Sequence, residues 1–164
     1  MAGEEAQIRT AHYVPAGTDR FRGKKREVFG SRVIDFKVSA LDTNGGLSVS
    51  ELIDVEKGGP ARHFHHAQEE WFYVAEGEYI IEVGDERYEL GAGDSVLAPR
   101  KVEHVWAHVG EGRGRLIVAL QPAGEIEEFF DDLAKLGSNP RREELRRVFT
   151  SHGLELTGPP LSIE

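Results

Sequence analysis

Cysteine is absent from this chain of 164 residues. Disulfide bonds and thiolate metal ligands are therefore excluded, and any bound metal must be held by nitrogen and oxygen atoms. The chain also lacks an apolar run long enough to cross a bilayer, and residues 1–20 contain no positively charged segment followed by an apolar one. We therefore expect a protein that has no membrane partner and works in the cytoplasm.

Positive charge is scarce, because 20 Lys and Arg residues stand against 29 Asp and Glu residues and the formal net charge is −9. This balance argues against a general affinity for phosphate backbones, so nucleic acid is not an expected partner. One basic cluster does occur, at Arg20, Arg22, Lys24, Lys25 and Arg26. On an acidic protein such a cluster indicates a solvated segment or a subunit contact more often than a phosphate site.

Residues 1–31 show no sustained hydrophobic period, and we interpret them as an extended arm. A period of two then begins with Ile34, Phe36 and Val38, which alternate with polar residues and predict a strand. Asn44-Gly45-Gly46 predicts a hairpin turn. Further strands are expected near residues 47–55, 62–66, 70–75, 78–83, 86–90, 94–98, 104–109 and 114–121. Turns at this density predict an antiparallel sandwich or barrel over residues 32–121.

The hydrophobic period changes after Pro122. Ile126, Phe129, Phe130 and Leu133 follow the spacing of an amphipathic helix, which Gly137 would end. A second helix is expected to begin at Asn139-Pro140 and to run to Gly153. We expect this helical extension, residues 122–164, to pack on the outside of the sheet. Acidic residues form a solvated face of the first helix in this interpretation: Glu125, Glu127, Glu128, Asp131 and Asp132.

Three histidines and one glutamate form the pattern that suggests chemistry. Residues two apart on a strand point to the same face, so His63 and His65 can converge while Phe64 points away. Glu70 and His104 would then come from neighbouring strands. Imidazole and carboxylate suit iron, manganese, nickel, cobalt or zinc, and the ligand set does not choose among these metals. We expect one divalent transition metal per chain, held by these four residues.

Written as spacings, the two segments are His63-x-His65-x4-Glu70-x6-Gly77 and Gly93-x5-Pro99-x4-His104. They resemble the two conserved motifs of the cupin superfamily, and the resemblance extends over residues 47–120. The tail over residues 122–161 is similar to that of small single-domain cupins called quercetin-dioxygenase-like. The resemblance implies an all-β jelly-roll barrel, with an N-terminal arm and two C-terminal helices here, that holds the metal in its interior. It also implies a homodimer.

Two positions depart from the family pattern. Lys101 stands where the second motif usually has glycine, and a lysine adopts the backbone angle of that position only at some cost. His108 stands where the motif usually has asparagine. His104, Trp106 and His108 share one strand face, so Trp106 would form a wall for a flat ligand if His104 enters the barrel. We expect Phe72, Trp106 and His108 to bind substrate; the alternatives are barrel filling for the aromatic residues and a core role for His108.

Two residues compete with the expected ligands. Glu69 is adjacent to Glu70, and only the six-residue gap before Gly77 favours Glu70. His66 is adjacent to His65 and should face the opposite way, which indicates a surface or core histidine.

The leading functional hypothesis is a metal-dependent dioxygenase for a small aromatic or dicarbonyl compound, in which Glu70 acts as general base toward a substrate enol or phenol. An isomerase or decarboxylase would use the same metal to stabilise an enediolate without dioxygen. A non-enzymatic barrel that binds a small molecule is the third hypothesis, because a fold does not fix a function.

Overall fold

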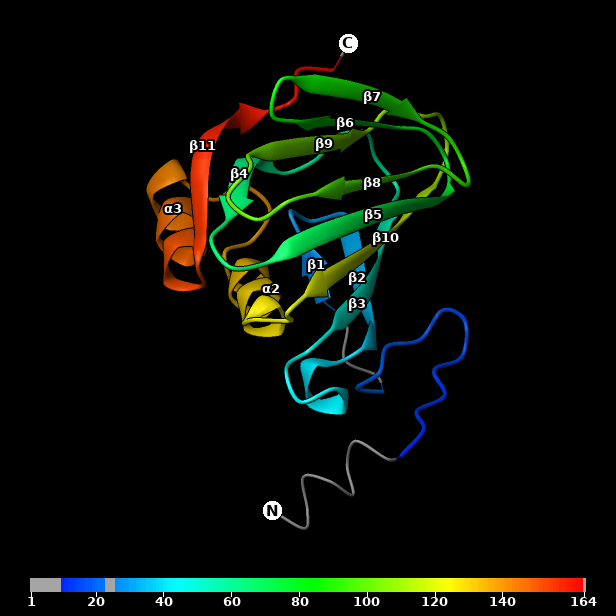
Figure 1. The fold of residues 1–164 in the computed structure, drawn as a ribbon. Coiled ribbons are helices and arrows are strands. Elements are labelled where there is room, and N and C mark those ends of the chain that lie inside the picture. Colours follow the sequence, from blue (N-terminus) through cyan, green and yellow to red (C-terminus); the bar gives the residue numbers. More distant parts are fainter. Residues whose placement is uncertain (1–9, 23–25, 164) are drawn as a thin grey trace.

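The computed structural model describes residues 10–22 and 26–163, whose strands form two antiparallel sheets that face each other (Figure 1). The larger sheet has six strands in the order β1-β2-β3-β10-β5-β8. Their bounds are Arg26–Val28 for β1, Arg32–Val38 for β2, Ser48–Asp54 for β3, Gly114–Gln121 for β10, Glu69–Glu76 for β5 and Ser95–Ala98 for β8. This arrangement confirms the predicted all-β jelly roll.

The smaller sheet has five strands in the order β11-β4-β9-β6-β7. Their bounds are Leu154–Pro160 for β11, Ala61–His65 for β4, His104–His108 for β9, Tyr79–Val83 for β6 and Glu86–Leu90 for β7. The strands from β3 to β10 lie within a residue or two of their predicted positions, because alternating burial and frequent turns are local signals.

The core lies between the two sheets and follows the alternation of side chains along each strand. In β10, Leu116, Val118 and Leu120 point inward and are buried. They face a set of buried aromatic and aliphatic residues from both sheets that includes Phe72 and Ile81. The interior is thus mainly apolar, and a group of buried histidines is part of its polar minority.

Two short strands were not expected from the sequence. β1 lies within the predicted arm, residues 1–31, and pairs with β2, while β11 lies within the predicted helical extension, residues 122–164, and pairs with β4. β1 is too short to show a period, and β11 contains Gly158-Pro159-Pro160, which predicts a loop. Proline is tolerated in β11 because it is an edge strand. Both sheets therefore extend beyond residues 32–121.

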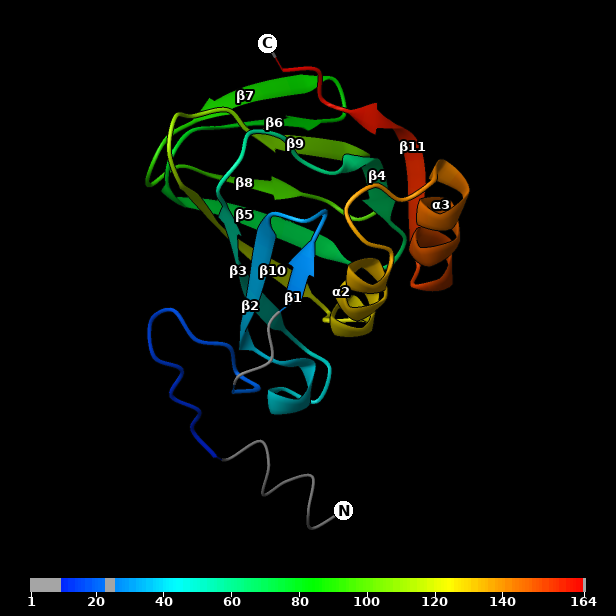
Figure 2. The same ribbon diagram turned by 180° about the vertical axis from the view of Figure 1, so that it is seen from behind.

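Two α-helices follow β10, α2 over Ile126–Lys135 and α3 over Arg142–Ser151. The second helix begins after Arg141 and not at Asn139-Pro140, because the N–H of Arg141 binds the side chain of Glu144 and closes the first turn there. The expectation that the helices lie on the outside of the sheet was wrong for α2. Its buried residues Ile126, Phe129 and Leu133 face the space between the sheets, where α2 lies close to β1 (Figure 2).

No helix in the described ranges is long and apolar enough to cross a membrane. The short 3-10 helix η1, Ala40–Asp42, connects β2 to β3. It lies below the barrel in Figure 1, near the N-terminal segment.

Two of the three described residues of the basic cluster, Arg20 and Arg26, form ion pairs within the chain. Arg20 donates to both carboxylate oxygens of Asp42, and the Arg26 side chain is buried between Asp19 and Asp131, at 3.2 and 2.9 Å. Arg22 is exposed, and Lys24 and Lys25 lie outside the described residues. The acidic face of α2 is correspondingly not only solvated, because Asp131 binds Arg26 and Glu127 accepts from the N–H of Ala40.

Candidate metal centre

The four predicted ligands come from three strands in two sheets. His63 and His65 lie on the inward face of β4, with Phe64 between them on the other face. His104 lies at the start of β9, directly opposite His63 in the strand register. Glu70 lies on β5 of the facing sheet. The site is thus assembled from strands of both sheets, and no single strand could bring these side chains together.

The ligand atoms of these four side chains converge. Oε2 of Glu70 lies 2.8 Å from Nε2 of His65 and 2.8 Å from Nε2 of His104. One ligand atom from each of the four residues falls within 4.8 Å of every other. All four residues are buried, with exposed fractions between 1% for His104 and 7% for Glu70.

Each imidazole is oriented by a hydrogen bond at its other nitrogen. Nδ1 of His63 lies 2.7 Å from the carbonyl oxygen of Ala61, and Nδ1 of His104 lies 3.3 Å from that of Val102. Carbonyl oxygens only accept, so both rings carry their proton on Nδ1. Their Nε2 lone pairs are therefore directed at the cluster, which is the arrangement that metal-binding histidines require.

Gln68 performs the same task for His65, a role that the sequence did not indicate. Its Oε1 lies 3.0 Å from Nδ1 of His65, while its Nε2 donates to the carbonyl oxygens of Pro122 and Ala123 at 2.9 and 2.7 Å. With its amide nitrogen committed to two carbonyls, Gln68 can only accept from His65. The segment after β10 thereby fixes the orientation of a ligand on β4.

The converging atoms are not satisfied by one another. Nε2 of His65, Nε2 of His104 and Oε2 of Glu70 are buried without a hydrogen bond of acceptable geometry to any described residue, although the two nitrogens lie close to the oxygen. Buried polar atoms without partners are costly and rare in folded proteins. A divalent ion would satisfy all of them at once, so this donor set fits a single transition metal.

Burial and mutual charge set the protonation of the cluster. Burial, aided by the nearby His104 and His65, lowers the pKa of His63 to about 3, so this ligand is neutral at physiological pH. Burial alone would raise the pKa of Glu70, but His65 and His104 outweigh it and hold that pKa well below its ordinary value. For His65, burial lowers the pKa and the Glu70 carboxylate raises it by more. A divalent cation that binds here would displace a proton from His65, because a metal ligand must be a neutral imidazole, whereas Glu70 is already in its ligand form.

A small cavity of about 40 Å³ lies beside the cluster, and its surface is almost entirely apolar. Its polar lining consists of His63, His65, Glu70 and Arg32. The other walls come from strands of both sheets and from the two helices. The apolar lining residues are Val28, Phe29, Leu52, Pro60, Trp106, Val118, Ile126, Phe129, Phe130, Leu133, Phe149 and Leu154. The ring of Phe149 on α3 lies 5.3 Å from that of His63. The helices that follow the barrel therefore complete the pocket.

The three residues predicted to bind substrate lie in different places. Trp106 lines the cavity. Phe72 is wholly buried outside this lining, with its ring 5.7 Å from that of His104. His108 lies at the far end of β9, where Nδ1 bonds to the carbonyl oxygen of Glu56 at 3.1 Å and the ring packs 5.2 Å from Tyr79. Sharing a strand face with His104 did not bring His108 to the same pocket.

The structure separates the competing residues as the spacing indicated. Glu69 points outward and binds Arg100, while Glu70 points inward. His66 lies outside as well and pairs with Glu155 at 3.2 Å. Lys101 adopts a φ of 67°, the left-handed conformation expected from the glycine of the family pattern. This turn leads directly into β9 and so positions His104.

Comparison with known proteins agrees with this geometry. Residues 51–120 match the model of the Cupin domain family. The barrel has the cupin jelly-roll fold. Its fold is also that of an RmlC-like cupin from Shewanella frigidimarina, with a TM-score of 0.57, 23% identity and coverage of 72% of this chain and 96% of the other.

Two curated proteins are similar in sequence to the cupin domain. Protein SchB of Streptomyces halstedii is 31% identical over 80 residues, which cover 49% of this chain and 56% of SchB. Polyketide synthase CurC of Streptomyces cyaneus is 29% identical over 62 residues, 38% of this chain and 40% of CurC. The chain thus spans about half the length of the curated relatives that it matches.

Proposed function

We propose that this cupin is a metal-dependent dioxygenase that acts on a small aromatic or dicarbonyl compound. The observation that carries the proposal is the cluster of His63, His65, Glu70 and His104, whose unsatisfied atoms border an apolar cavity. Four protein ligands leave room on an octahedral ion for further ligands.

Glu70 is the residue that we propose to move a proton. A bound divalent ion would act as a Lewis acid and would make an enol or phenol substrate more acidic. Glu70 is ionised beside His65 and His104, which is the protonation state that a general base must have before it accepts a proton. Gln68 and the carbonyl of Val102 keep the two imidazoles in place while the carboxylate acts.

The walls of the cavity support an aromatic or dicarbonyl substrate. Trp106, Phe129 and Phe149 offer flat apolar surfaces, which pack well against a planar ring or a conjugated enol. The similarity to a protein named as a polyketide synthase also supports this class, because polyketides carry carbonyl groups on alternate carbons. Dioxygenation would place both atoms of dioxygen in such a substrate, so no separate reductant is needed.

The first test is the metal content of the purified protein, measured by elemental mass spectrometry. The variant is His63→Ala/His104→Ala, and the matched control is His66→Ala, which removes an exposed histidine next to the site. We expect near-stoichiometric iron, nickel or manganese in the wild type and in the control, and its loss in the variant. Equal metal in all three proteins would refute the site.

The second test is oxygen uptake with phenols and 1,3-diketones. Consumption that needs the metal and is lost in Glu70→Gln supports the dioxygenase. Turnover of a substrate without oxygen uptake would instead indicate an isomerase or decarboxylase at the same centre. Binding of these compounds with no turnover in any metal form would indicate a small-molecule-binding cupin.

A further inference from the structure

One charged residue in the cavity has no part in the metal cluster. Arg32, the first residue of β2, lines the same cavity as His63, His65 and Glu70 and is 8% exposed. Guanidinium groups are always charged at physiological pH and are costly to bury. A buried guanidinium therefore needs partners for its charge and for its N–H groups.

Arg32 is held firmly at its position. Its Nε donates to Oδ1 of Asp54 at 2.5 Å and its Nη2 donates to the carbonyl oxygen of Gly58 at 3.2 Å. Its guanidinium also lies 4.7 Å above the ring of Trp106, a cation–π contact. Asp54 is fixed in turn by the hydroxyl of Tyr79, which donates to its other oxygen at 2.7 Å. The group is thus rigid, as a recognition residue should be.

These contacts do not use all the donors of Arg32. A guanidinium has five N–H groups. Nη1 forms no hydrogen bond with any residue in the described part of the chain. A ligand oxygen can therefore bind Arg32 without displacing the contacts that hold it.

The unused donor of Arg32 belongs to a charged group in a largely apolar cavity. Hydrogen bonds from a guanidinium to a carboxylate are stronger than neutral ones, and attraction between charges increases where water is excluded. This donor therefore favours a ligand with a negatively charged head.

We propose that Arg32 is an anion-binding residue and that the natural ligand is a small monoanion, a carboxylate or an enolate with a flat apolar body. Its charged head binds Arg32 beside Trp106, and its body lies along the aromatic wall from α2 and α3 once these helices have moved apart, because a cavity of about 40 Å³ does not hold an aromatic ring as it stands. The proposal rests on the proposed function for the reaction itself, and it narrows the substrate class to anionic aromatic or dicarbonyl compounds. Arg32 is a substrate-binding residue in this assignment.

The test measures binding, not turnover. Isothermal titration with benzoate and with its neutral isostere benzamide compares two ligands of the same shape that differ in charge. The variant is Arg32→Gln/Asp54→Asn, which removes both members of the ion pair and leaves no unpaired buried carboxylate. Asp54→Asn alone keeps Arg32, and its amide can still accept from Arg32 and donate to the Tyr79 oxygen. The control is Arg115→Gln/Glu51→Gln, which removes an ion pair of the same kind at another place.

The wild type should prefer benzoate to benzamide by about tenfold or more, the usual value of a hydrogen bond to a charged group. The double variant should lose this preference, Asp54→Asn should increase it, and the control should keep it. Benzoate affinity that survives in the folded, metal-loaded double variant would overturn the proposal, as would a wild type that does not distinguish the two ligands. Circular dichroism and metal content show whether the variants are folded and loaded.

The outcome is separable from that of the proposed reaction. If the purified protein contains no metal but binds benzoate through Arg32, the metal chemistry is refuted and the anion site is supported. If the metal-loaded protein consumes oxygen but Arg32→Gln/Asp54→Asn leaves benzoate binding unchanged, the reaction is supported and the anion site is refuted.

Discussion

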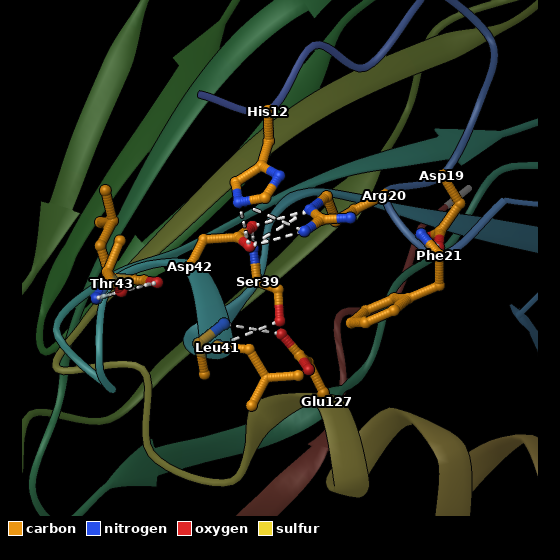
Figure 3. A network of polar contacts seen from close by, with 11 residues as sticks. His12, Asp19, Arg20, Phe21, Ser39, Leu41, Asp42, Thr43 and Glu127 are labelled. Carbon is orange, nitrogen blue, oxygen red and sulfur yellow. Dashed lines mark hydrogen bonds and ion pairs between the residues drawn. The ribbon is translucent and has the colours of Figure 1, made fainter. Parts of the chain in front are cut away.

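Two clusters of buried and half-buried charge in this protein have opposite properties. In the first, around η1, Asp42 accepts three hydrogen bonds from Arg20 at 2.9 to 3.2 Å and one from the N–H of Ser39 at 3.0 Å, with His12 nearby (Figure 3). In the second, the ligand atoms of His65, His104 and Glu70 converge but have no hydrogen bonds of acceptable geometry. The first cluster is complete within the protein and the second is not.

Whether the buried polar atoms have hydrogen-bond partners distinguishes a structural network from a candidate binding site here. The types of residue do not, because both clusters contain histidine and a carboxylate. The η1 network connects the N-terminal segment to α2, because Glu127 accepts from the N–H of Ala40 (Figure 3). All its members gain from folding alone. A cation would satisfy the atoms of the histidine cluster that folding leaves without partners. The hydrogen bonds at the Nδ1 atoms keep the Nε2 atoms directed at the position of such a cation.

The largest effect should come from removing the metal. If the metal is present at about 100 times its dissociation constant, a chelator should lower the stability by about 2.7 kcal/mol. This corresponds to a fall in the melting temperature of about 5–10 °C for a chain of this size. Thermal unfolding with and without EDTA should show this shift in the wild type and in Asp42→Asn, and none in His104→Ala. A shift in His104→Ala would contradict the assignment of the cluster.

Gln68→Met should weaken metal binding without removing a ligand. The change keeps the length of the side chain but leaves Nδ1 of His65 without an acceptor, and loss of such an orienting contact costs about 10–100-fold in metal affinity. Competition with a fluorescent chelator measures it. The conservative change Gln68→Glu, which keeps an acceptor oxygen at that position, should retain more of the affinity; equal loss in both would indicate that the role of Gln68 is only to pack.

Asp42→Asn should destabilise the fold by about 1–3 kcal/mol, because Arg20 and Ser39 lose a charged acceptor in a largely buried position. Urea unfolding measures this change. Metal content should remain that of the wild type. An effect on metal content would show that the two clusters are coupled and would weaken the comparison.

The pH dependence of this effect follows from Asp42 itself. Burial raises its pKa, but the hydrogen bonds from Arg20 and Ser39 and the charge of Arg20 outweigh burial, so the pKa in the folded protein lies below the ordinary value. The stabilisation is therefore complete above the unfolded pKa of about 4 and is lost as the pH falls through the folded pKa. Wild type and Asp42→Asn should differ by a constant amount between pH 5 and 7 and converge in more acidic solution. A constant difference down to pH 2.5 would contradict this.

Lys101→Gly should give the smallest effect. The left-handed conformation costs a lysine about 1–2 kcal/mol, and the greater freedom of unfolded glycine offsets about 0.5–1 kcal/mol of that. The variant should be more stable by up to about 1 kcal/mol. Arg100→Gly, at a neighbouring position with ordinary φ, should instead lose stability. Metal content should be unchanged in both, which would show that the turn positions His104 well enough with lysine.

Much of the fold was predictable because its signals are local. The alternation of buried and less buried side chains along β3 and β10 is visible within a few residues of sequence, and so is each turn between strands. The spacing of the four candidate ligands predicted the cluster that the structure brings together. The sequence did not indicate β1 or β11, nor the contact of Arg26 with Asp131, which are 105 residues apart. These features depend on pairings between distant segments, for which short windows of sequence contain no signal.

The sequence by itself determined which side chains could be metal ligands and which face of each strand they occupy, because a period of two fixes the direction of every side chain on a strand. Tertiary structure alone decided that Trp106 borders the cavity while His108 lies far from it, that α2 forms a wall, and that Arg32 faces the same space as the histidines. The direction in which a side chain points from a strand is set by its place in the local alternation of residues. Convergence in space is set by sheet register and by the packing of segments distant in the chain.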